Sequence, residues 1–204
     1  MIKLLIATNN RGKLQEYQEI LVNLPVTLTY LDAEGITLDP EETGATFVEN
    51  AIIKAQAFAQ TSGLLTLADD SGLEVDALGG EPGVYSARYG QTGRPDQPRR
   101  NQLVLDQLAA KNVPWAERTA RFRCVVALAT PERVIGTVEG TVEGFIIYEP
   151  KGNNGFGYDP IFFVPEFNQT LGEVAAEQKH SISHRGRAAQ AAIPLIEQAV
   201  KDNG

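Results

Sequence analysis

Short apolar segments alternate with longer helix-patterned segments through the first 70 residues of this 204-residue chain. Residues 3–7 and 26–30 have the pattern of strands, and the segment between them repeats its apolar residues at helical spacing. Thr46 and Glu49 have the spacing of a capping box, which predicts the start of a second helix. The apolar run 64–68 after that helix predicts a third strand. Strands that alternate with helices are typical of an α/β fold.

The second half of the chain has a different pattern, in which two strands follow one another directly. Residues 121–129 and 134–142 read as strands, and the four residues between them predict a hairpin. A short strand over 161–164 and a long alanine-rich helix follow. A hairpin added to alternating strands and helices predicts a mixed sheet. Because the chain contains no repeat, low-complexity tract or linker, we expect one domain over residues 1–204.

Charge and residue counts exclude several classes of protein. A net charge of −8 repels phosphate polymers, so we expect no nucleic acid partner. One cysteine and two histidines leave no intramolecular disulfide and no cysteine-rich zinc site. That cysteine, Cys124, begins an apolar run and is predicted to be a buried, inert thiol. The apolar run over residues 4–7 is too short for a signal peptide or a membrane span, so we expect a cytoplasmic protein without a membrane partner.

The segment A-T-N-N-R-G-K over residues 7–13 lies between a predicted strand and a predicted helix. It nearly has the spacing of a phosphate loop, but Ala7 replaces the first glycine and Leu14 replaces the final serine or threonine. A true P-loop nucleotidase is therefore disfavoured. Free backbone N–H groups at a helix start, together with Lys13, still attract phosphate. A plain strand-to-helix turn with a solvated lysine is the competing interpretation.

Two acidic pairs could hold a metal ion. Asp69 and Asp70 directly follow the predicted strand 64–68, where ligands often bind in α/β folds, and paired carboxylates suit Mg²⁺. A turn or helix cap is the alternative. Glu41 and Glu42 form the second pair, which by itself indicates only a solvated loop. Lys54, on the helix that follows, is either a surface lysine or a residue facing a triphosphate.

Two further segments could recognise a ligand. In the glycine-rich segment 152–159, Phe156 and Tyr158 could stack on a base or could equally fill the core. Ser183 has the character of an N-cap, which places His184 and Arg185 in the first turn of the last helix. Cations are disfavoured there, so a nearby anion or acceptor is implied. Because the chain lacks a G-x-S-x-G segment, we reject a Ser-His nucleophilic pair.

Six segments, in this order and across nearly the whole chain, resemble the inosine/xanthosine triphosphate pyrophosphatase family. Each is modest alone, but the ordered set is highly specific, whereas residues 91–118 match poorly. The segments are T-N-N-R-G-K from Thr8, E-T-G-A-T-F-V-E-N-A-I-I-K-A from Glu42, A-D-D-S-G-L from Ala68, G-G-E-P-G-V-Y-S-A-R-Y from Gly79, G-F-G-Y-D-P-I-F from Gly155 and S-H-R-G from Ser183.

This resemblance implies an elongated two-lobed α/β fold with a mixed sheet and an active-site cleft between the lobes. It implies a homodimer that hydrolyses ITP, dITP and XTP to a monophosphate and pyrophosphate. By match, Glu42 and Asp70 would hold Mg²⁺, and Asp70 would also accept a proton. The phosphate-binding residues would be Thr8, Asn9, Asn10, Arg11, Gly12, Lys13, Lys54 and Ser71. The base pocket would consist of Phe156, Gly157, Tyr158, Asp159, Lys179, His184 and Arg185.

Two alternatives stay open at this point. One is a pyrophosphatase of the same fold that acts on modified pyrimidine or methylated nucleotides. The other is a non-catalytic purine nucleotide sensor, which the acidic pairs disfavour because a sensor needs no metal-activated water. The implied purine preference is chemically consistent, since a guanidinium only donates hydrogen bonds and so favours a 6-oxo group over the amino group of adenine.

Overall fold

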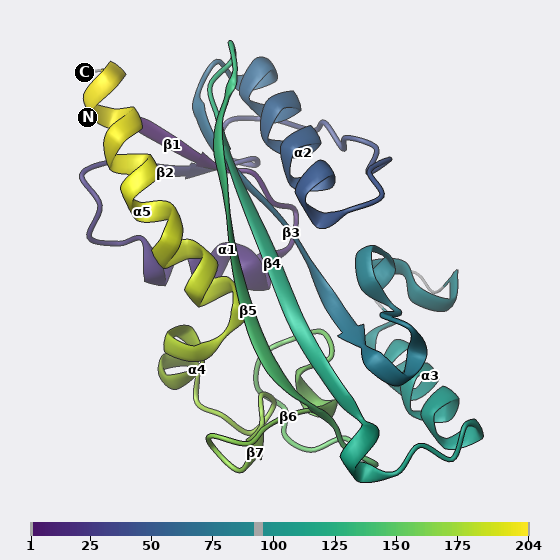
Figure 1. Ribbon diagram of the computed structural model, residues 1–204. Helices are drawn as coiled ribbons and strands as arrows, with labels where there is room; N and C mark the ends of the chain where they lie inside the picture. Colours follow the sequence, from purple (N-terminus) through teal and green to yellow (C-terminus); the bar gives the residue numbers. More distant parts are fainter. Residues whose placement is uncertain (1, 92–95, 204) are drawn as a thin grey trace. The chain divides into compact units, whose positions relative to one another are not determined.

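The computed structural model describes residues 2–91 and 96–203, without the side chains of 176, 177, 180 and 203 (Figure 1). Its strands are β1 (Lys3–Ile6), β2 (Thr27–Tyr30), β3 (Leu65–Val75), β4 (Thr119–Ala129), β5 (Val134–Ile146), β6 (Phe162–Val164) and β7 (Gln169–Thr170). Its α-helices are α1 (Arg11–Ile20), α2 (Phe47–Ser62), α3 (Gln97–Ala110), α4 (Ala176–Ile182) and α5 (His184–Asn203). Short 3-10 segments are η1 (Asp76–Leu78), η2 (Gly83–Gln91), η3 (Trp115–Glu117) and η4 (Asp159–Ile161).

The strands form a mixed sheet, which confirms the predicted fold class. Their hydrogen-bonded order is β2-β1-β3-β4-β5-β6-β7. The strand β1 pairs in parallel with both β2 and β3, whereas β6 pairs antiparallel with β5 and β7. The turn of the predicted hairpin is closed by a hydrogen bond of 2.9 Å from the Thr130 amide to the Arg133 carbonyl. Both hairpin strands are longer than the sequence predicts.

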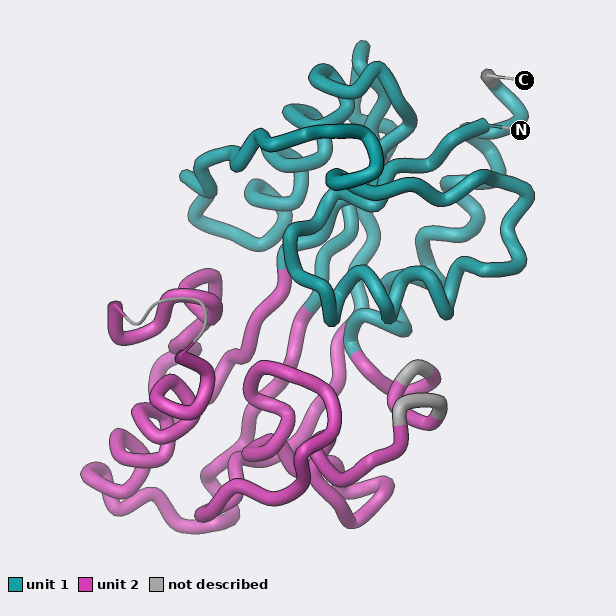
Figure 2. The backbone as a smooth tube through the Cα atoms, turned by 180° about the vertical axis from the view of Figure 1, so that it is seen from behind, with its two compact units in different colours: residues 1–70, 124–140, 184–204 teal, residues 71–123, 141–183 magenta. Residues whose placement is uncertain are grey.

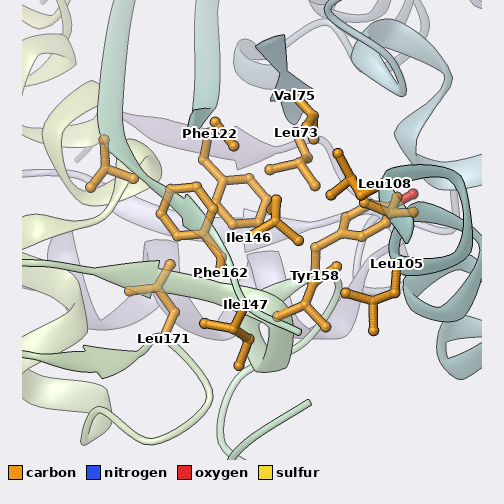
Figure 3. Packing of buried hydrophobic residues seen from close by; sticks show 14 of the residues in the cluster. Leu73, Val75, Leu105, Leu108, Phe122, Ile146, Ile147, Tyr158, Phe162 and Leu171 are labelled. Carbon is orange, nitrogen blue, oxygen red and sulfur yellow. The ribbon is translucent and has the colours of Figure 1, made fainter. Parts of the chain in front are cut away.

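The chain divides into two compact units, and each is built from separate stretches of sequence (Figure 2). Unit 1 contains residues 1–70, 124–140 and 184–204, and unit 2 contains residues 71–123 and 141–183. Each unit has its own hydrophobic cluster. In unit 1 the cluster includes Leu4, Ile6, Tyr17, Leu67, Val126 and Ala192. In unit 2 it includes Leu73, Leu105, Phe122, Ile146, Tyr158 and Phe162 (Figure 3).

The strand β3 continues through the acidic pair, so the prediction that it ends at residue 68 is wrong. Asp69 and Asp70 lie in the middle of an 11-residue strand. A strand can carry two buried acids only where cations compensate them. Lys13 and Lys54 each place an amino group 2.8 Å from one of these carboxylates. The strand therefore has no electrostatic reason to stop.

The helix α2 begins and ends as the sequence predicts. The Glu49 amide donates to Thr46 Oγ1 and the Thr46 amide donates to Glu49 Oε2, both at 3.2 Å, which completes the capping box. Gly63 ends the helix in the left-handed conformation, with φ of 71°. Asn50 and Lys54 are one turn apart on this helix, so they share a face.

The last helix starts where the sequence places it, but a separate short helix precedes it. The helix α5 begins at His184, directly after the predicted cap Ser183. Ser183 is extended, with φ of −67° and ψ of 156°, and this interrupts the chain between α4 and α5. Lys179 therefore lies on α4. Among the described helices, none combines the length and the apolar character that a membrane crossing requires.

Candidate active site

Lys54 joins the two carboxylates that the resemblance assigns to a metal ion. Its amino group lies 2.8 Å from Glu42 Oε1 and 2.8 Å from Asp70 Oδ1. All three side chains are largely buried, with 12%, 16% and 9% of the side chain exposed for Lys54, Glu42 and Asp70. Burial disfavours the charged form and raises the pKa of the Asp70 carboxyl, although Lys54 opposes the shift. Two acids from distant segments therefore meet at one cation.

Asn50 is a site residue that sequence reasoning missed. Its side chain is fully buried, and Nδ2 donates to Asp70 Oδ2 at 3.2 Å. Its Oδ1 accepts the Gly44 amide at 2.8 Å. A Cβ at Gly44 would lie 2.7 Å from that same oxygen, so only glycine fits there. Asn50 thus links the loop that carries Glu42 to Asp70, and its spacing of four from Lys54 was the available signal.

The Asp69 carboxylate pairs with cationic side chains of the protein. Its side chain is 1% exposed, and Oδ2 accepts from Lys13 Nζ at 2.8 Å and lies 3.6 Å from Arg185 Nε. Burial alone would raise the pKa of the Asp69 carboxyl, but the charges of Lys13, Arg185 and Lys54 outweigh it. That pKa therefore lies well below its usual value, and Asp69 is an ionised anchor for Lys13 and Arg185.

Arg185 lies in the same buried network of unit 1. Its Nη1 donates to Glu16 Oε2 at 2.6 Å, and its side chain is 1% exposed. Cys124 lies 3.5 Å from Asp69 Oδ2, and burial raises the pKa of its thiol to about 12. The prediction of a buried cysteine is confirmed, and the raised pKa of its thiol is consistent with the predicted inertness. The placement of His184 and Arg185 beside a base stays a prediction; His184 is 5% exposed and Arg185 has two carboxylates near it.

The loop before α1 differs from the predicted set of free backbone donors. Asn10 is the N-cap of α1, and its Oδ1 accepts from the Gly12 amide at 2.9 Å and the Lys13 amide at 3.2 Å. The Asn10 amide in turn donates to Thr8 Oγ1 at 3.2 Å. These three N–H groups therefore already have acceptors, and the idea that they are free is wrong. Asn9 and Arg11 are exposed, so phosphate binding here would depend on side chains.

In unit 2, Phe156, Asp159 and Lys179 form one cluster. Asp159 Oδ2 accepts from the Phe156 amide at 2.8 Å and from Lys179 Nζ at 2.7 Å. Lys179 Nζ also lies 4.9 Å from the centre of the Phe156 ring. A Cβ at Gly155 would lie 2.1 Å from Asp159 Oδ2, so this turn requires glycine. Phe156 as a residue is half-buried, in contrast to the buried Asp159 and Lys179.

Tyr158 belongs to the core of unit 2, which is one of the two interpretations that its sequence context allows. It is 3% exposed, and its hydroxyl donates to the Ser86 carbonyl at 2.8 Å. Figure 3 shows its ring with Leu105 and Leu108 in the buried cluster. Of the two aromatic residues, Phe156 is therefore the less buried one and the better candidate for stacking.

The predicted site residues divide between the two units. Unit 1 brings together Lys13, Glu42, Lys54, Asp70 and Arg185. They are joined by Asp69, from the predicted acidic pair, and by Asn50 and Glu16, which the sequence did not single out. Unit 2 carries Ser71, Phe156, Gly157, Tyr158, Asp159 and Lys179. Among the side chains that the structure describes, no three from His, Cys, Asp or Glu are close enough to form a metal site by themselves. Two carboxylates converge, on Lys54.

Comparisons with known proteins agree over nearly the whole chain. The sequence pattern of the Ham1 family matches residues 4–195. A dITP/XTP pyrophosphatase of Desulforamulus reducens is 50% identical over 196 residues, which are 96% of each chain. The Bacillus subtilis dITP/XTP pyrophosphatase is 46% identical, over 97% of this chain and 98% of its own.

Solved structures agree with the sequence matches. A HAM1 protein from Coxiella burnetii superposes with a TM-score of 0.86 at 42% identity and covers 97% of this chain and 100% of its own. The Staphylococcus aureus Ham1 protein gives 0.83 at 38% identity, over 97% and 99%. Fold, sequence and family pattern thus support the resemblance seen in the six ordered segments. The chain belongs to the Ham1 family.

Proposed function

We propose that this chain hydrolyses the non-standard purine nucleoside triphosphates ITP, dITP and XTP to a monophosphate and pyrophosphate, and so cleanses the nucleotide pool. The names of its relatives, dITP/XTP pyrophosphatases at 44–50% identity, support this substrate class. One observation in the structure carries the proposal. Glu42 and Asp70 converge on a single cationic group, Lys54 Nζ, at 2.8 Å each.

This geometry fits Mg²⁺. The ion commonly binds to proteins through one or two carboxylates, and water and substrate phosphates complete its octahedron. The Lys54 amino group stands in for a cation between the two carboxylates, so the same oxygens of Glu42 and Asp70 can hold Mg²⁺ when nucleotide is bound. When bound, Mg²⁺ neutralises phosphate charge and makes a coordinated water more acidic. Lys54 would then be released toward the phosphates.

The protein residues supply the remaining chemistry. Asp70 would accept the proton from the attacking water, as the resemblance implies, because its carboxylate lies beside Lys54 and Asn50 in the buried site. Asn50 holds one of its oxygens, so Asp70 is already oriented before substrate binds. Lys13, Lys54 and Arg11 offer positive charge to the phosphates. The neutral residues of the matched segments, Thr8, Asn9, Asn10, Gly12 and Ser71, would complete the phosphate-binding set through hydrogen bonds.

Base recognition is proposed for Phe156, Gly157, Tyr158, Asp159, Lys179, His184 and Arg185. The half-buried position of Phe156 supports stacking, and the buried Tyr158 would contribute through its backbone. We further propose one functional domain over 1–204, because neither unit is a continuous stretch of chain and the family pattern spans both. A cytoplasmic homodimer without nucleic acid or membrane partners completes the proposal, on the basis of the family resemblance and the negative charge.

Release of pyrophosphate from a panel of triphosphates tests the substrate class. We expect kcat/KM for ITP, dITP and XTP to exceed that for ATP, dGTP and modified pyrimidine triphosphates, and the release to require Mg²⁺. Faster turnover of a modified pyrimidine triphosphate would instead favour the pyrimidine enzyme. Tight ITP binding without release would favour the sensor.

Replacement of Lys54 tests whether its amino group occupies the metal position. Lys54→Met leaves Glu42 and Asp70 without their shared cation, so we expect Mn²⁺ to bind without nucleotide about tenfold more tightly than in wild type. Turnover should fall, because a positive charge near the phosphates is lost. Manganese binding followed by electron paramagnetic resonance measures the first effect. Unchanged Mn²⁺ affinity would show that the Lys54 amino group does not occupy the metal position. The matched control is Lys3→Met, which removes a half-exposed lysine from an ion pair with Glu34.

Replacement of Lys13 tests its role in triphosphate binding. Lys13→Ala should weaken binding of a non-hydrolysable ITP analogue much more than binding of IMP, because a lysine after such a loop acts on the outer phosphates. Calorimetry with both ligands in the presence of Mg²⁺ gives the two affinities. Equal losses for the two ligands would mean that Lys13 does not select the triphosphate.

A further inference from the structure

The segment Gly155–Asp159 of unit 2 is fixed by side chains from several elements. Asp159 and Lys179 hold its first half through the Phe156 amide and ring. The Tyr158 hydroxyl donates to the Ser86 carbonyl. The Ser86 hydroxyl in turn accepts from the Leu73 amide at 2.9 Å. The peptide between Gly157 and Tyr158 lies between these two anchors, and a third contact holds its carbonyl group.

Asn101 supplies that third anchor from α3. Its Nδ2 donates to the Gly157 carbonyl at 3.3 Å across 56 residues of sequence, and the residue is 5% exposed. The carbonyl accepts only, so it defines which end of the Asn101 amide faces it. Gly157 is left-handed, with φ of 72°, and the Asn101 amide holds the carbonyl that follows this turn.

Asparagine at position 101 has a cost in folding free energy, because the same face of α3 also carries core residues. Leu105 and Leu108 of the same helix pack in the cluster that contains Tyr158 (Figure 3). The buried Oδ1 of Asn101 has no hydrogen-bond partner among the described residues. Burying a polar atom without a partner costs free energy, so core packing alone favours an apolar residue at this position. The hydrogen bond to Gly157 is the contact that leucine cannot reproduce.

We propose that Asn101 is a positioning residue for base recognition, acting through the Gly157 carbonyl. By fixing the peptide that follows Phe156 and Gly157, it sets the orientation in which the Phe156 ring meets a purine base. This inference rests on the proposed function and extends it to α3, within the part of the chain that the family motifs cover poorly. It predicts that replacing Asn101 weakens binding of the base end of the substrate and leaves binding of the phosphate end unchanged.

The test uses two ligands, each of which represents one end of the substrate. Calorimetry with IMP and with pyrophosphate, both with Mg²⁺, measures the affinities of wild type, Asn101→Leu and Asn101→Asp. The leucine has a similar volume and no donor, and the aspartate has the same shape with an acceptor in place of the donor. We expect IMP affinity to fall about fivefold or more in both, because the hydrogen bond that holds the Gly157 carbonyl is lost, with pyrophosphate affinity unchanged. KM for dITP should rise by a similar factor.

The control is Gln102→Ala, one residue along α3, where the exposed side chain pairs with Asp106 and should leave both affinities unchanged. A purely structural role would lower the melting temperature and the active fraction while the two dissociation constants stay as in wild type, and that result would overturn the inference. Equal weakening of IMP and pyrophosphate would overturn it as well. Failure of the wild type to hydrolyse dITP would contradict the proposed function, whereas the comparison of the two ligands tests Asn101 by binding alone.

Discussion

Asp70→Asn is expected to lower kcat for dITP by at least about 100-fold while much of the nucleotide affinity remains. The variant keeps the shape of the side chain but loses both the negative charge proposed to hold Mg²⁺ and the carboxylate proposed to accept a proton from water. General base catalysis alone contributes about 10²–10⁴-fold. The asparagine can accept from only one of the two donors, Asn50 and Lys54, but Lys54 keeps its ion pair with Glu42, so the fold should survive. Turnover at saturating Mg²⁺, compared with ITP affinity by calorimetry, separates the two effects.

The matched control for this change is Glu41→Gln, which removes an acid from the loop beside Glu42. Glu41 is exposed, so its loss should change kcat less than about twofold. A variant Asp70→Asn that keeps more than a tenth of wild-type turnover would show that Asp70 is not the proton acceptor.

Asp69→Ala is expected to destabilise the fold by roughly 3–5 kcal/mol, the usual cost of removing one partner from a buried ion pair. Asp69 is 1% exposed and lies against Lys13 and Arg185, so its removal leaves Arg185 with Glu16 and leaves Lys13 without its anchor. Chemical denaturation measures the change in the free energy of unfolding. Lys13 should also lose its orientation, so KM for dITP should rise in the folded fraction.

The control for Asp69 is Asp76→Ala, which removes a surface carboxylate that accepts from Arg121 and Thr119. The Asp76 side chain is 42% exposed and that of Arg121 is 30% exposed. An exposed pair of this kind stabilises by about 0–1 kcal/mol. The pKa of Asp69 is lower in the folded state, so its stabilisation is fully present above the unfolded-state pKa and is lost as pH falls through the folded-state pKa. The difference in stability between wild type and Asp69→Asn should therefore narrow as pH falls below 3.8, the ordinary pKa of an aspartate. Similar costs for Asp69→Ala and Asp76→Ala would show that the buried network contributes little.

The fold class could be predicted because its signals are local. The capping box at Thr46 and Glu49 fixes the start of α2, and the alternation of strands and helices predicts the parallel strands. The end of β3 could not be predicted from local pattern. Asp69 and Asp70 have the composition of a turn, and only Lys13 and Lys54, distant in sequence, make them compatible with a strand.

The site itself could be predicted in part. The pairing of Glu42 with Asp70 followed from the family resemblance, and the structure brings both to Lys54. The cap of α1 was not predicted: Asn10 Oδ1 satisfies the first amides of the helix, and the role of Asn10 in phosphate binding stays a prediction. Asn50 was missed although its spacing from Lys54 places both on one helix face, and Asn101 was missed because only the fold shows its partner Gly157.

The most direct test of the account is to identify the products formed from dITP in the presence of Mg²⁺. Ion-exchange chromatography separates the monophosphate, the diphosphate, pyrophosphate and orthophosphate after a single round of hydrolysis. The account predicts dIMP and pyrophosphate in equal amounts, formed only with Mg²⁺ and lost in Asp70→Asn. Formation of dIDP and orthophosphate, or no hydrolysis of dITP at an enzyme concentration that binds it fully, would contradict the account.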